Sequence, residues 1–234
     1  MKKNLNPICQ SFADLIFPRH CYGCSAGLRF YEKYLCLKCH IALPLSYLPQ
    51  ANAKNNPLVQ KLSSLFPLET ATSLFYFEKE GVLAHLIHLL KYKGVHQLGT
   101  FFGEWLAEHL LGYSFISSVE GIIPVPLHPK RKKIRGYNQA EIIAKTVAQK
   151  LNLPLYTAAL KRIRNTTSLV LLGDRERENE MAGAILYAKK IQNAKHLLLI
   201  DDVLTTGTTL NTCAQSILEE GPIKLSIAVI GYRL

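Results

Sequence analysis

The run Leu197-Leu198-Leu199-Ile200 is followed at once by two acids, Asp201 and Asp202. A continuous apolar stretch of this length is typical of a strand buried on both faces of a parallel sheet. A short turn rich in threonine and glycine comes next, and then residues 208–220 show helical spacing. Because a buried strand that leads straight into a helix is the building unit of parallel sheets, this segment predicts an α/β fold.

The same alternation runs through residues 73–234, which we predict to be one domain with a mainly parallel sheet flanked by helices. Strands are expected at 73–77, 121–125, 196–201 and 225–230, and helices at 82–90, 97–111, 137–151 and 208–220. Residues 49–57 are polar and bounded by prolines, so 49–72 is predicted to be a linker and entry segment. Residues 1–48 then form a small separate module. With 48% hydrophobic residues, a chain of 234 residues can bury one full core beside such a module.

The segment after Ile200 has the features of a phosphate-binding loop. In open α/β sheets, ligands bind at the carboxyl edge, where the two carboxylates are delivered. The free N–H groups at the start of the following helix attract a phosphate, and Gly207 permits close approach of the backbone. Hydroxyl donors come from Thr205, Thr206, Thr208 and Thr209. Asp201 and Asp202 suit ribose hydroxyls, or a Mg²⁺ ion carried by the ligand.

Two other interpretations of this segment explain less of it. A capped helix after a strand accounts for one threonine, but not for four threonines with two acids and a glycine. A nucleoside-triphosphatase would use the acids to hold its metal and needs a GxxxxGK[ST] loop. The nearest candidate, Gly94 to Gly99, continues with Thr100 and lacks the lysine.

Four cysteines in the N-terminal module are spaced as two CxxC pairs: Cys21, Cys24, Cys36 and Cys39. This spacing predicts a four-thiolate site with structural zinc, because so short a module cannot bury enough apolar surface alone. A pair of disulfides and a redox CxxC are the alternatives, and His20 or His40 could replace one cysteine. Cys9 lies outside the pattern, and Cys213 is expected to be a thiol packed in a helix.

The net charge of the chain indicates which classes of partner it can bind. Lys and Arg number 28 against 17 Asp and Glu, which gives a formal net charge of +11. Such a surplus favours polyanions such as nucleic acid or phosphorylated metabolites, although it is also compatible with a merely solubilising surface. No apolar run is long enough to cross a bilayer and no secretory signal is evident, so a cytoplasmic location is expected.

Basic residues elsewhere are candidates for contact with a diphosphate or a nucleic-acid backbone. Lys91 and Lys93 follow a helix, and the basic block 130–135, which includes Arg135, lies between a strand and a helix. Solvated surface is the alternative for both groups. Asn138 and Gln139 open the next helix, where their amides could bind ligand or cap the helix. Three tyrosines lie near these basic residues and could stack on bases or belong to the core: Tyr92, Tyr137 and Tyr156. Three arginines are expected to lie apart from the loop: Arg162, Arg164 and Arg177.

Residues 197–209 resemble the diphosphate-sugar signature of type I phosphoribosyltransferases over all 13 positions. The wider chain resembles the ComF-type proteins linked to natural competence. That resemblance is carried by the double CxxC after Phe17-Pro18, by Leu90-Lys91-Tyr92-Lys93-Gly94, and by Pro124–Arg131 leading into Arg135–Ala140. It implies that the loop binds phosphoribosyl diphosphate with Mg²⁺, and that Lys91 contacts the diphosphate.

The resemblance also has departures. The family's Thr-x-x-Gln becomes Thr166 with Leu169, and its Arg-x-x-Asn becomes Arg177 with Glu180, which bears on recognition of an acceptor. Two functions therefore remain open. The first is a ligand-binding protein that acts with DNA-uptake proteins on single-stranded DNA. The second is an enzyme that transfers phosphoribose to a nitrogen acceptor, with Asp201 and Asp202 holding the ribose in the catalytic site.

Overall fold

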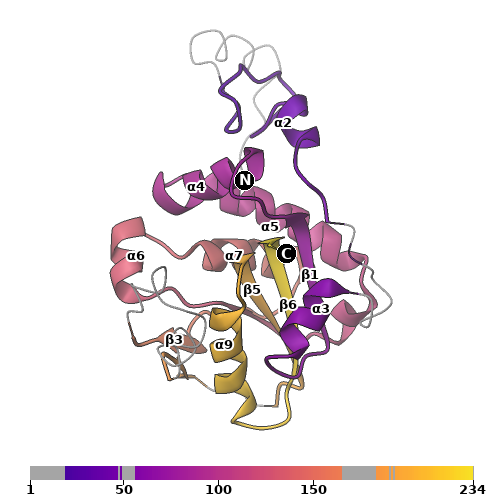
Figure 1. The fold of residues 1–234 in the computed structure, drawn as a ribbon, viewed down its shortest axis with the longest axis vertical. Coiled ribbons are helices and arrows are strands. Elements are labelled where there is room, and N and C mark those ends of the chain that lie inside the picture. Colours follow the sequence, from indigo (N-terminus) through magenta and orange to yellow (C-terminus); the bar gives the residue numbers. More distant parts are fainter. Residues whose placement is uncertain are drawn as a thin grey trace.

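A computed structural model describes residues 19–46, 48, 56–164, 183–189, 191 and 193–233. Its centre is a sheet of four parallel strands in the order β1 (Thr70–Tyr76), β6 (Lys224–Tyr232), β5 (His196–Leu204) and β2 (Gly121–Pro124). Figure 1 shows helices on both sides of these strands. The predicted α/β fold with a parallel sheet is therefore confirmed, as are its four strands to within a few residues.

The two faces of the sheet bury separate apolar clusters. Along β5, Leu198 and Ile200 contact one cluster, whereas Leu197 and Leu199 contact the other, as alternation of side chains along a strand requires. The first cluster is covered by α4 (Val82–Tyr92), α5 (His96–Leu111) and α7 (Gln139–Leu151). The second is covered by α3 (Pro57–Ser63) and α9 (Thr208–Leu218). The run that predicted a doubly buried strand is fully buried in the structure.

Several short elements were not predicted. The 3-10 helix η2 (Ser114–Ser118) follows α5, and α6 (Pro129–Arg135) is a single basic helix that Pro129 begins and Gly136 ends. Strands β3 (Leu160–Arg162) and β4 (Ile185–Tyr187) form a separate antiparallel pair. The side chain of Asn56 caps α3, which lies inside the segment interpreted as linker and entry. Residues 49–55 lie outside the described part, so the domain boundaries remain a prediction.

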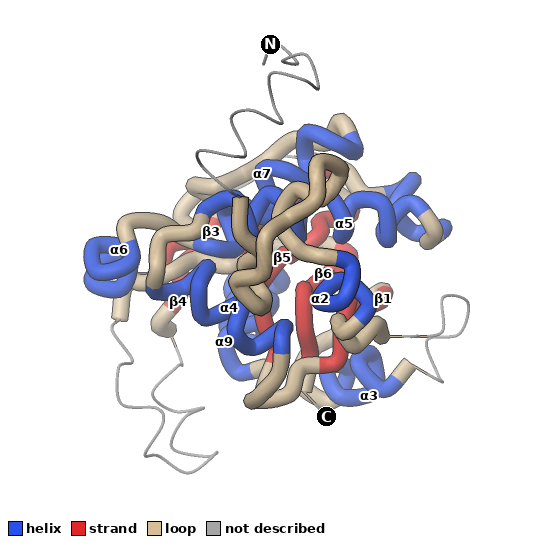
Figure 2. Tube along the Cα trace, turned by 90° about the horizontal axis from the view of Figure 1, so that it is seen from above, coloured by secondary structure: helices blue, strands red, loops and turns tan. Residues whose placement is uncertain are grey.

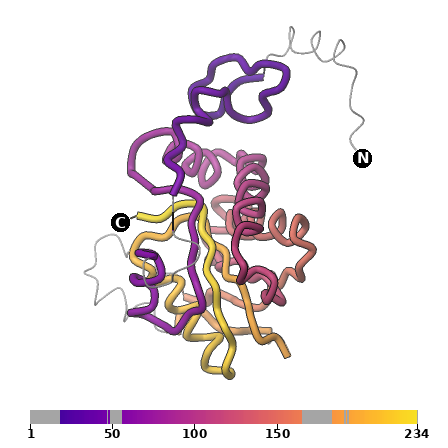
Figure 3. The backbone as a smooth tube through the Cα atoms, turned by 90° about the vertical axis from the view of Figure 1, so that its right-hand side faces the viewer, coloured from indigo at the N-terminus to yellow at the C-terminus, as the bar shows by residue number. Residues whose placement is uncertain are grey.

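The N-terminal module packs on the helices of the first cluster. The module contains the short helix α2 (Leu37–Ile41). Figure 3 shows the module as a separate lobe at one end of the molecule. Seen from above in Figure 2, its loops overlie the strands. Rings form the contact: Tyr34 meets Phe101 of α5 at 5.7 Å, and His40 stacks on Trp105 at 4.7 Å between centroids. The module therefore shares its apolar contacts with the main domain. No helix in the described residues is long and apolar enough to cross a membrane.

The contribution of His196 to stability is expected to fall as the pH drops below about 6.5, the ordinary pKa of histidine. His196 is 2% exposed, its two ring nitrogens lie 2.8 Å from the hydroxyls of Ser118 and Ser226, and burial lowers its pKa. The unfolded chain therefore takes up a proton at this residue at a higher pH than the folded chain, which disfavours the folded state as the pH falls. Urea unfolding of the wild type and of His196→Gln checks this. The difference between the two proteins should change over that range, and a constant difference would contradict it.

Candidate functional site

The turn between β5 and α9 lies at the edge of the sheet and leads into the start of a helix. Gly207 is the residue before α9, and its φ of 88° is in the left-handed region that glycine tolerates best. Gly207 offers no side chain to cap the helix, and the N–H of Thr208 makes only a long contact of 3.5 Å with Oγ1 of Thr206. Thr206 and Thr208 share a hydrogen bond between their hydroxyls at 2.9 Å. The N–H groups of the first turn of α9 are therefore available to an anion.

The two carboxylates at the end of β5 have different surroundings. Asp202 is 8% exposed, and its Oδ1 lies 2.8 Å from Nζ of Lys91. Asp201 accepts a hydrogen bond of 2.8 Å from the backbone N–H of Asp202. Burial and the neighbouring charge of Asp202 raise the pKa of Asp201 to about 7, against the opposing effects of that hydrogen bond and of Lys91 and Arg162. The structure thus holds one acid in an ion pair with Lys91 and a second acid that titrates near neutral pH.

A cavity of about 210 Å³ opens beside these acids. Six of the predicted ligand-binding residues line it: Lys91, Arg135, Asn138, Asp201, Asp202 and Thr209. The other four, Thr205, Thr206, Gly207 and Thr208, form the adjacent turn, where Thr205 and Thr206 are exposed. Residues from α4, α6, α7 and β5 therefore converge on one space, although they are far apart in the sequence.

Three further polar residues line the cavity, of which Arg162 was expected elsewhere, whereas Arg131 and Gln139 were left open between ligand contact and surface or helix cap. Arg162 was expected to lie away from the loop, but the structure corrects this: it projects from β3 into the cavity, together with Arg131 of α6 and Gln139 of α7. Arg162 is 8% exposed, and burial and the nearby Arg131 lower its pKa, whereas Asp201 acts in the opposite sense. The position of Arg162 could not be predicted, because the β3–β4 pair that brings it to the sheet edge was not predicted.

Charge in the cavity favours a polyanion. Four cationic side chains, Lys91, Arg131, Arg135 and Arg162, face the two carboxylates. Arginine forks match phosphate oxygens, and such charge-assisted hydrogen bonds are stronger than neutral ones. This set of side chains can therefore bind phosphate groups, and its carboxylates can accept hydrogen bonds from hydroxyls.

Asn138 has a structural role in addition to lining the cavity. Its Oδ1 accepts a hydrogen bond of 3.2 Å from the N–H of Ala140, and its Nδ2 donates to the carbonyl of Val125 at 2.9 Å. It therefore caps α7 and ties the end of β2 to it. Gln139 is 2% exposed, and its Oε1 accepts from Arg135 at 3.1 Å. Tyr137 is buried and Tyr156 packs against the second cluster, so both belong to the core.

The four cysteine sulfurs of the N-terminal module all lie within 4.8 Å of one another. The sulfurs of Cys24 and Cys36 are 3.7 Å apart, close to the ~3.8 Å expected between two thiolates on tetrahedral zinc with Zn–S bonds of ~2.3 Å. Burial disfavours a charged Cys21, but N–H donors of Cys36 and Gly23 at 3.2 and 3.3 Å outweigh it and lower the pKa of Cys21 to about 7. The donor set fits zinc without a histidine, since His40 stacks on Trp105.

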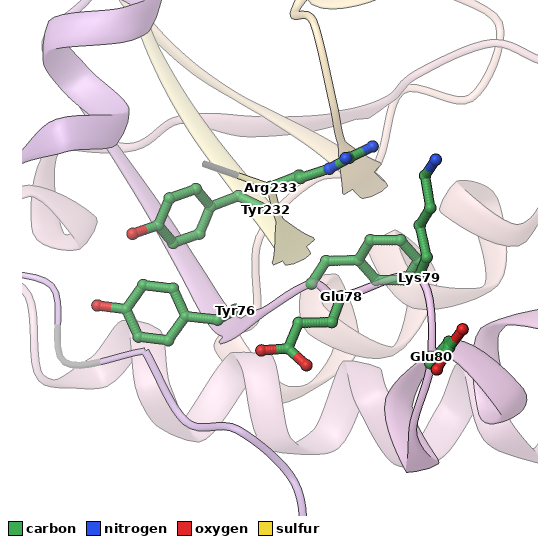
Figure 4. A pocket seen from close by; sticks show the side chains of 7 residues that line it. Tyr76, Glu78, Lys79, Glu80, Tyr232 and Arg233 are labelled. Atoms are coloured by element: carbon green, nitrogen blue, oxygen red, sulfur yellow. The ribbon is translucent and has the colours of Figure 1, made fainter.

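A second, larger cavity of about 550 Å³ lies at the carboxyl ends of β1 and β6. Figure 4 shows Tyr76 and Tyr232 side by side at one end of it, with Glu78, Lys79 and Glu80 at the other. The two tyrosine rings are 5.2 Å apart, and the buried hydroxyl of Tyr232 has no hydrogen-bond partner among the described residues. This cavity and the smaller one open at the same edge of the sheet.

Comparison with known proteins bears on the family. Residues 138–234 match the phosphoribosyl transferase domain family. The chain is 26% identical over 211 residues to the DNA utilization protein YhgH of Escherichia coli O157:H7, covering 88% of this chain and 87% of that protein. It is also 32% identical over 110 residues to competence protein F of Haemophilus influenzae, covering 46% and 48% of the two chains. The predicted resemblance to ComF-type competence proteins, with a phosphoribosyl transferase domain, is thereby confirmed.

Among solved structures, this chain is similar to orotate phosphoribosyltransferase from Aeropyrum pernix, with 14% identity, a TM-score of 0.33 and coverage of 60% and 63% of the two chains. It is also similar to hypoxanthine-guanine phosphoribosyl transferase of L. donovani, with 12% identity, a TM-score of 0.32 and coverage of 59% and 71%. The departures from the family pattern at Thr166, Leu169, Arg177 and Glu180 lie outside the described residues.

Proposed function

We propose that this protein binds phosphoribosyl diphosphate, or a related phosphorylated ribose, in the cavity between β5, α4 and α6. The observation that carries the proposal is the convergence of the two acids of β5 with four cations around one small cavity. The 5-phosphate would bind the turn at Thr205–Thr209 and the start of α9. Asp201 and Asp202 would accept hydrogen bonds from the ribose hydroxyls, and the cations would hold the diphosphate. Mg²⁺ would arrive with the ligand as the partner of its diphosphate.

Binding calorimetry with phosphoribosyl diphosphate and Mg²⁺ tests this proposal. Wild type should bind one ligand per chain. Asp202→Asn should weaken binding at least about tenfold, because a charge-assisted hydrogen bond contributes about 1.5–3 kcal/mol. Glu108→Gln makes the same chemical change at an exposed carboxylate of α5 and should bind as the wild type does. Equal affinities of Asp202→Asn and the wild type would refute the assignment.

The biological role that we propose is in natural competence, in the handling of single-stranded DNA together with DNA-uptake proteins. The relatives named DNA utilization protein and competence protein support this role. The net charge of +11 supports a polyanionic partner as well. A fold that binds phosphoribose does not require that the sugar be transferred.

Sugar transfer to a nitrogen acceptor is the second candidate function. The cavity of Figure 4 favours it, because it opens at the same sheet edge and carries the carboxylates of Glu78 and Glu80, which could contact an acceptor. The assay is release of diphosphate from phosphoribosyl diphosphate and Mg²⁺ with a panel of nucleobases. No release with any base, in a protein that binds the ligand, would leave binding as the function.

For the N-terminal module, we propose that Cys21, Cys24, Cys36 and Cys39 hold one structural zinc ion. The support is the close group of sulfurs and the donors to Cys21. The ion would hold the loops of residues 19–46 together and so preserve the ring contacts with α5.

A further inference from the structure

Three rings lie along the outer face of α4. His85, His88 and Tyr92 are spaced at i, i+3 and i+7, which places them on one side of a helix. All three side chains are exposed, and Tyr92 is 58% exposed. The rings of His88 and Tyr92 are 5.0 Å apart with an angle of 42° between their planes. The opposite side of the helix is apolar and buried, so this ring face has no part in the core.

Arg135 holds Tyr92 in place and joins it to the ligand cavity. The guanidinium of Arg135 lies 4.9 Å from the centre of the Tyr92 ring and covers one of its faces. One of its terminal nitrogens donates to the Tyr92 hydroxyl at 3.1 Å, and the other donates to Gln139 at 3.1 Å. Arg135 also lines the small cavity. Tyr92 is therefore an exposed ring with a fixed orientation, which lowers the entropy cost of stacking on it.

The charged residues of α4 and α6, the two helices that Arg135 and Tyr92 join, are all basic. Lys93 is exposed directly after Tyr92, and exposed Lys130 and Lys133 belong to α6, the helix that ends in Arg135. Neither residues 81–93 nor residues 125–140 contain an aspartate or a glutamate. Aromatic faces beside phosphate-binding cations are the combination by which proteins bind single strands without sequence preference.

We propose that the outer face of α4, namely His85, His88 and Tyr92 with Arg135 and Lys93, is a binding surface for single-stranded DNA. Bases stack on the rings, and the lysine and arginine side chains contact the phosphates. The inference rests on the DNA-handling part of the proposed function and locates it on the molecule. A purely acidic protein partner would use the cations but not the rings, and this difference separates it from DNA.

Fluorescence anisotropy with a labelled oligothymidylate of about 20 nucleotides, a length sufficient for one such surface, tests the proposal. Tyr92→Leu in the full chain should weaken binding about tenfold, within the range measured for loss of one stacking ring. His88→Ala should weaken it about fivefold by the same argument. Tyr92→Phe keeps the ring and should stay within about threefold of the wild type.

Tyr31→Leu is the matched control. Tyr31 is also 58% exposed, and its hydroxyl accepts a hydrogen bond from Arg29 at 2.9 Å, but it belongs to the N-terminal module, where it lines a different cavity with Phe101 of α5. This variant should bind the oligonucleotide as the wild type does. Unfolding temperatures of the variants should match, which separates loss of binding from loss of folding.

Three outcomes would overturn the surface. One is equal binding by Tyr92→Leu and the wild type. Another is an equal loss in Tyr92→Leu and Tyr31→Leu. The third is complete displacement of the oligonucleotide by polyglutamate at equal charge, which would indicate that binding depends on charge and not on stacking. Calorimetry with phosphoribosyl diphosphate on the same proteins separates this result from the proposed ligand site. Ligand binding without ring-dependent DNA binding refutes only the surface, and the reverse refutes only the ligand site.

Discussion

Replacing Cys36 with serine is expected to release zinc and to unfold the N-terminal module while the parallel sheet remains folded. The four sulfurs lie within 4.8 Å of one another, and Cys36→Ser removes one of them while keeping the backbone N–H that donates to Cys21. Structural zinc contributes about 10–16 kcal/mol to small sites at neutral pH, which is more than so short a segment can replace by burying apolar surface.

The single tryptophan makes this effect measurable. Trp105 belongs to α5, but His40 of the module stacks on it at 4.7 Å, next to the cysteine at position 39. Loss of the module should expose the indole and shift its emission to longer wavelength. Zinc analysis should fall from about one ion per chain to near zero.

Cys213→Ala serves as the control for the zinc prediction. Cys213 is buried in α9, on the other side of the sheet, and lies in the second apolar cluster. The variant should keep its zinc and its tryptophan emission, with a modest loss of stability of about 1 kcal/mol. Wild-type protein that is folded and free of metal, with unchanged emission, would refute the zinc site.

Asp201→Asn is expected to abolish ligand binding and, at the same time, to stabilise the unliganded protein above neutral pH. Burial and the charge of Asp202 raise the pKa of Asp201 to about 7, whereas an aspartate in an unfolded chain ionises near 3.9. Between these values the unfolded chain has lost the proton that the folded chain retains. Stability therefore falls as the pH rises through this window, and the amide removes that loss.

The expected gain is about 1–3 kcal/mol at about pH 8, and it should become small near about pH 4. Urea unfolding at several pH values measures it, and calorimetry with phosphoribosyl diphosphate measures the loss of binding. Such a combination is typical of a functional group that a protein retains at a cost in stability. A variant that is less stable at every pH, or that binds the ligand normally, would contradict the assignment of Asp201.

Much of the fold could be predicted because the hydrophobic periods are strong. The run at 197–200 and the helical spacing of 82–90 and 137–151 correspond to β5, α4 and α7 in the structure. The short elements could not be predicted in this way. Strands β3 and β4 have three residues each, and α6 is mostly basic, so none of them carries a hydrophobic period.

The site residues that are adjacent in the sequence could be predicted. Those that only the tertiary structure brings to the cavity could not. Asp201, Asp202 and the threonines follow one another in the chain, so the local sequence predicts that they form one binding site. Arg162 reaches the cavity only because β3 is positioned beside the sheet edge. Likewise, Tyr92 is distinguished from the buried Tyr137 by its exposure alone, which no local pattern indicates.

The most direct test of the central claim is a crystal structure of the protein with phosphoribosyl diphosphate and Mg²⁺. We expect the 5-phosphate at the turn formed by Thr205–Thr209, the ribose hydroxyls at Asp201 and Asp202, and the diphosphate beside Lys91 and Arg135. Such binding would also require the 2.8 Å ion pair between Lys91 and Asp202 to rearrange around the ligand. A ligand bound elsewhere on the molecule, with this cavity unchanged, would contradict the account.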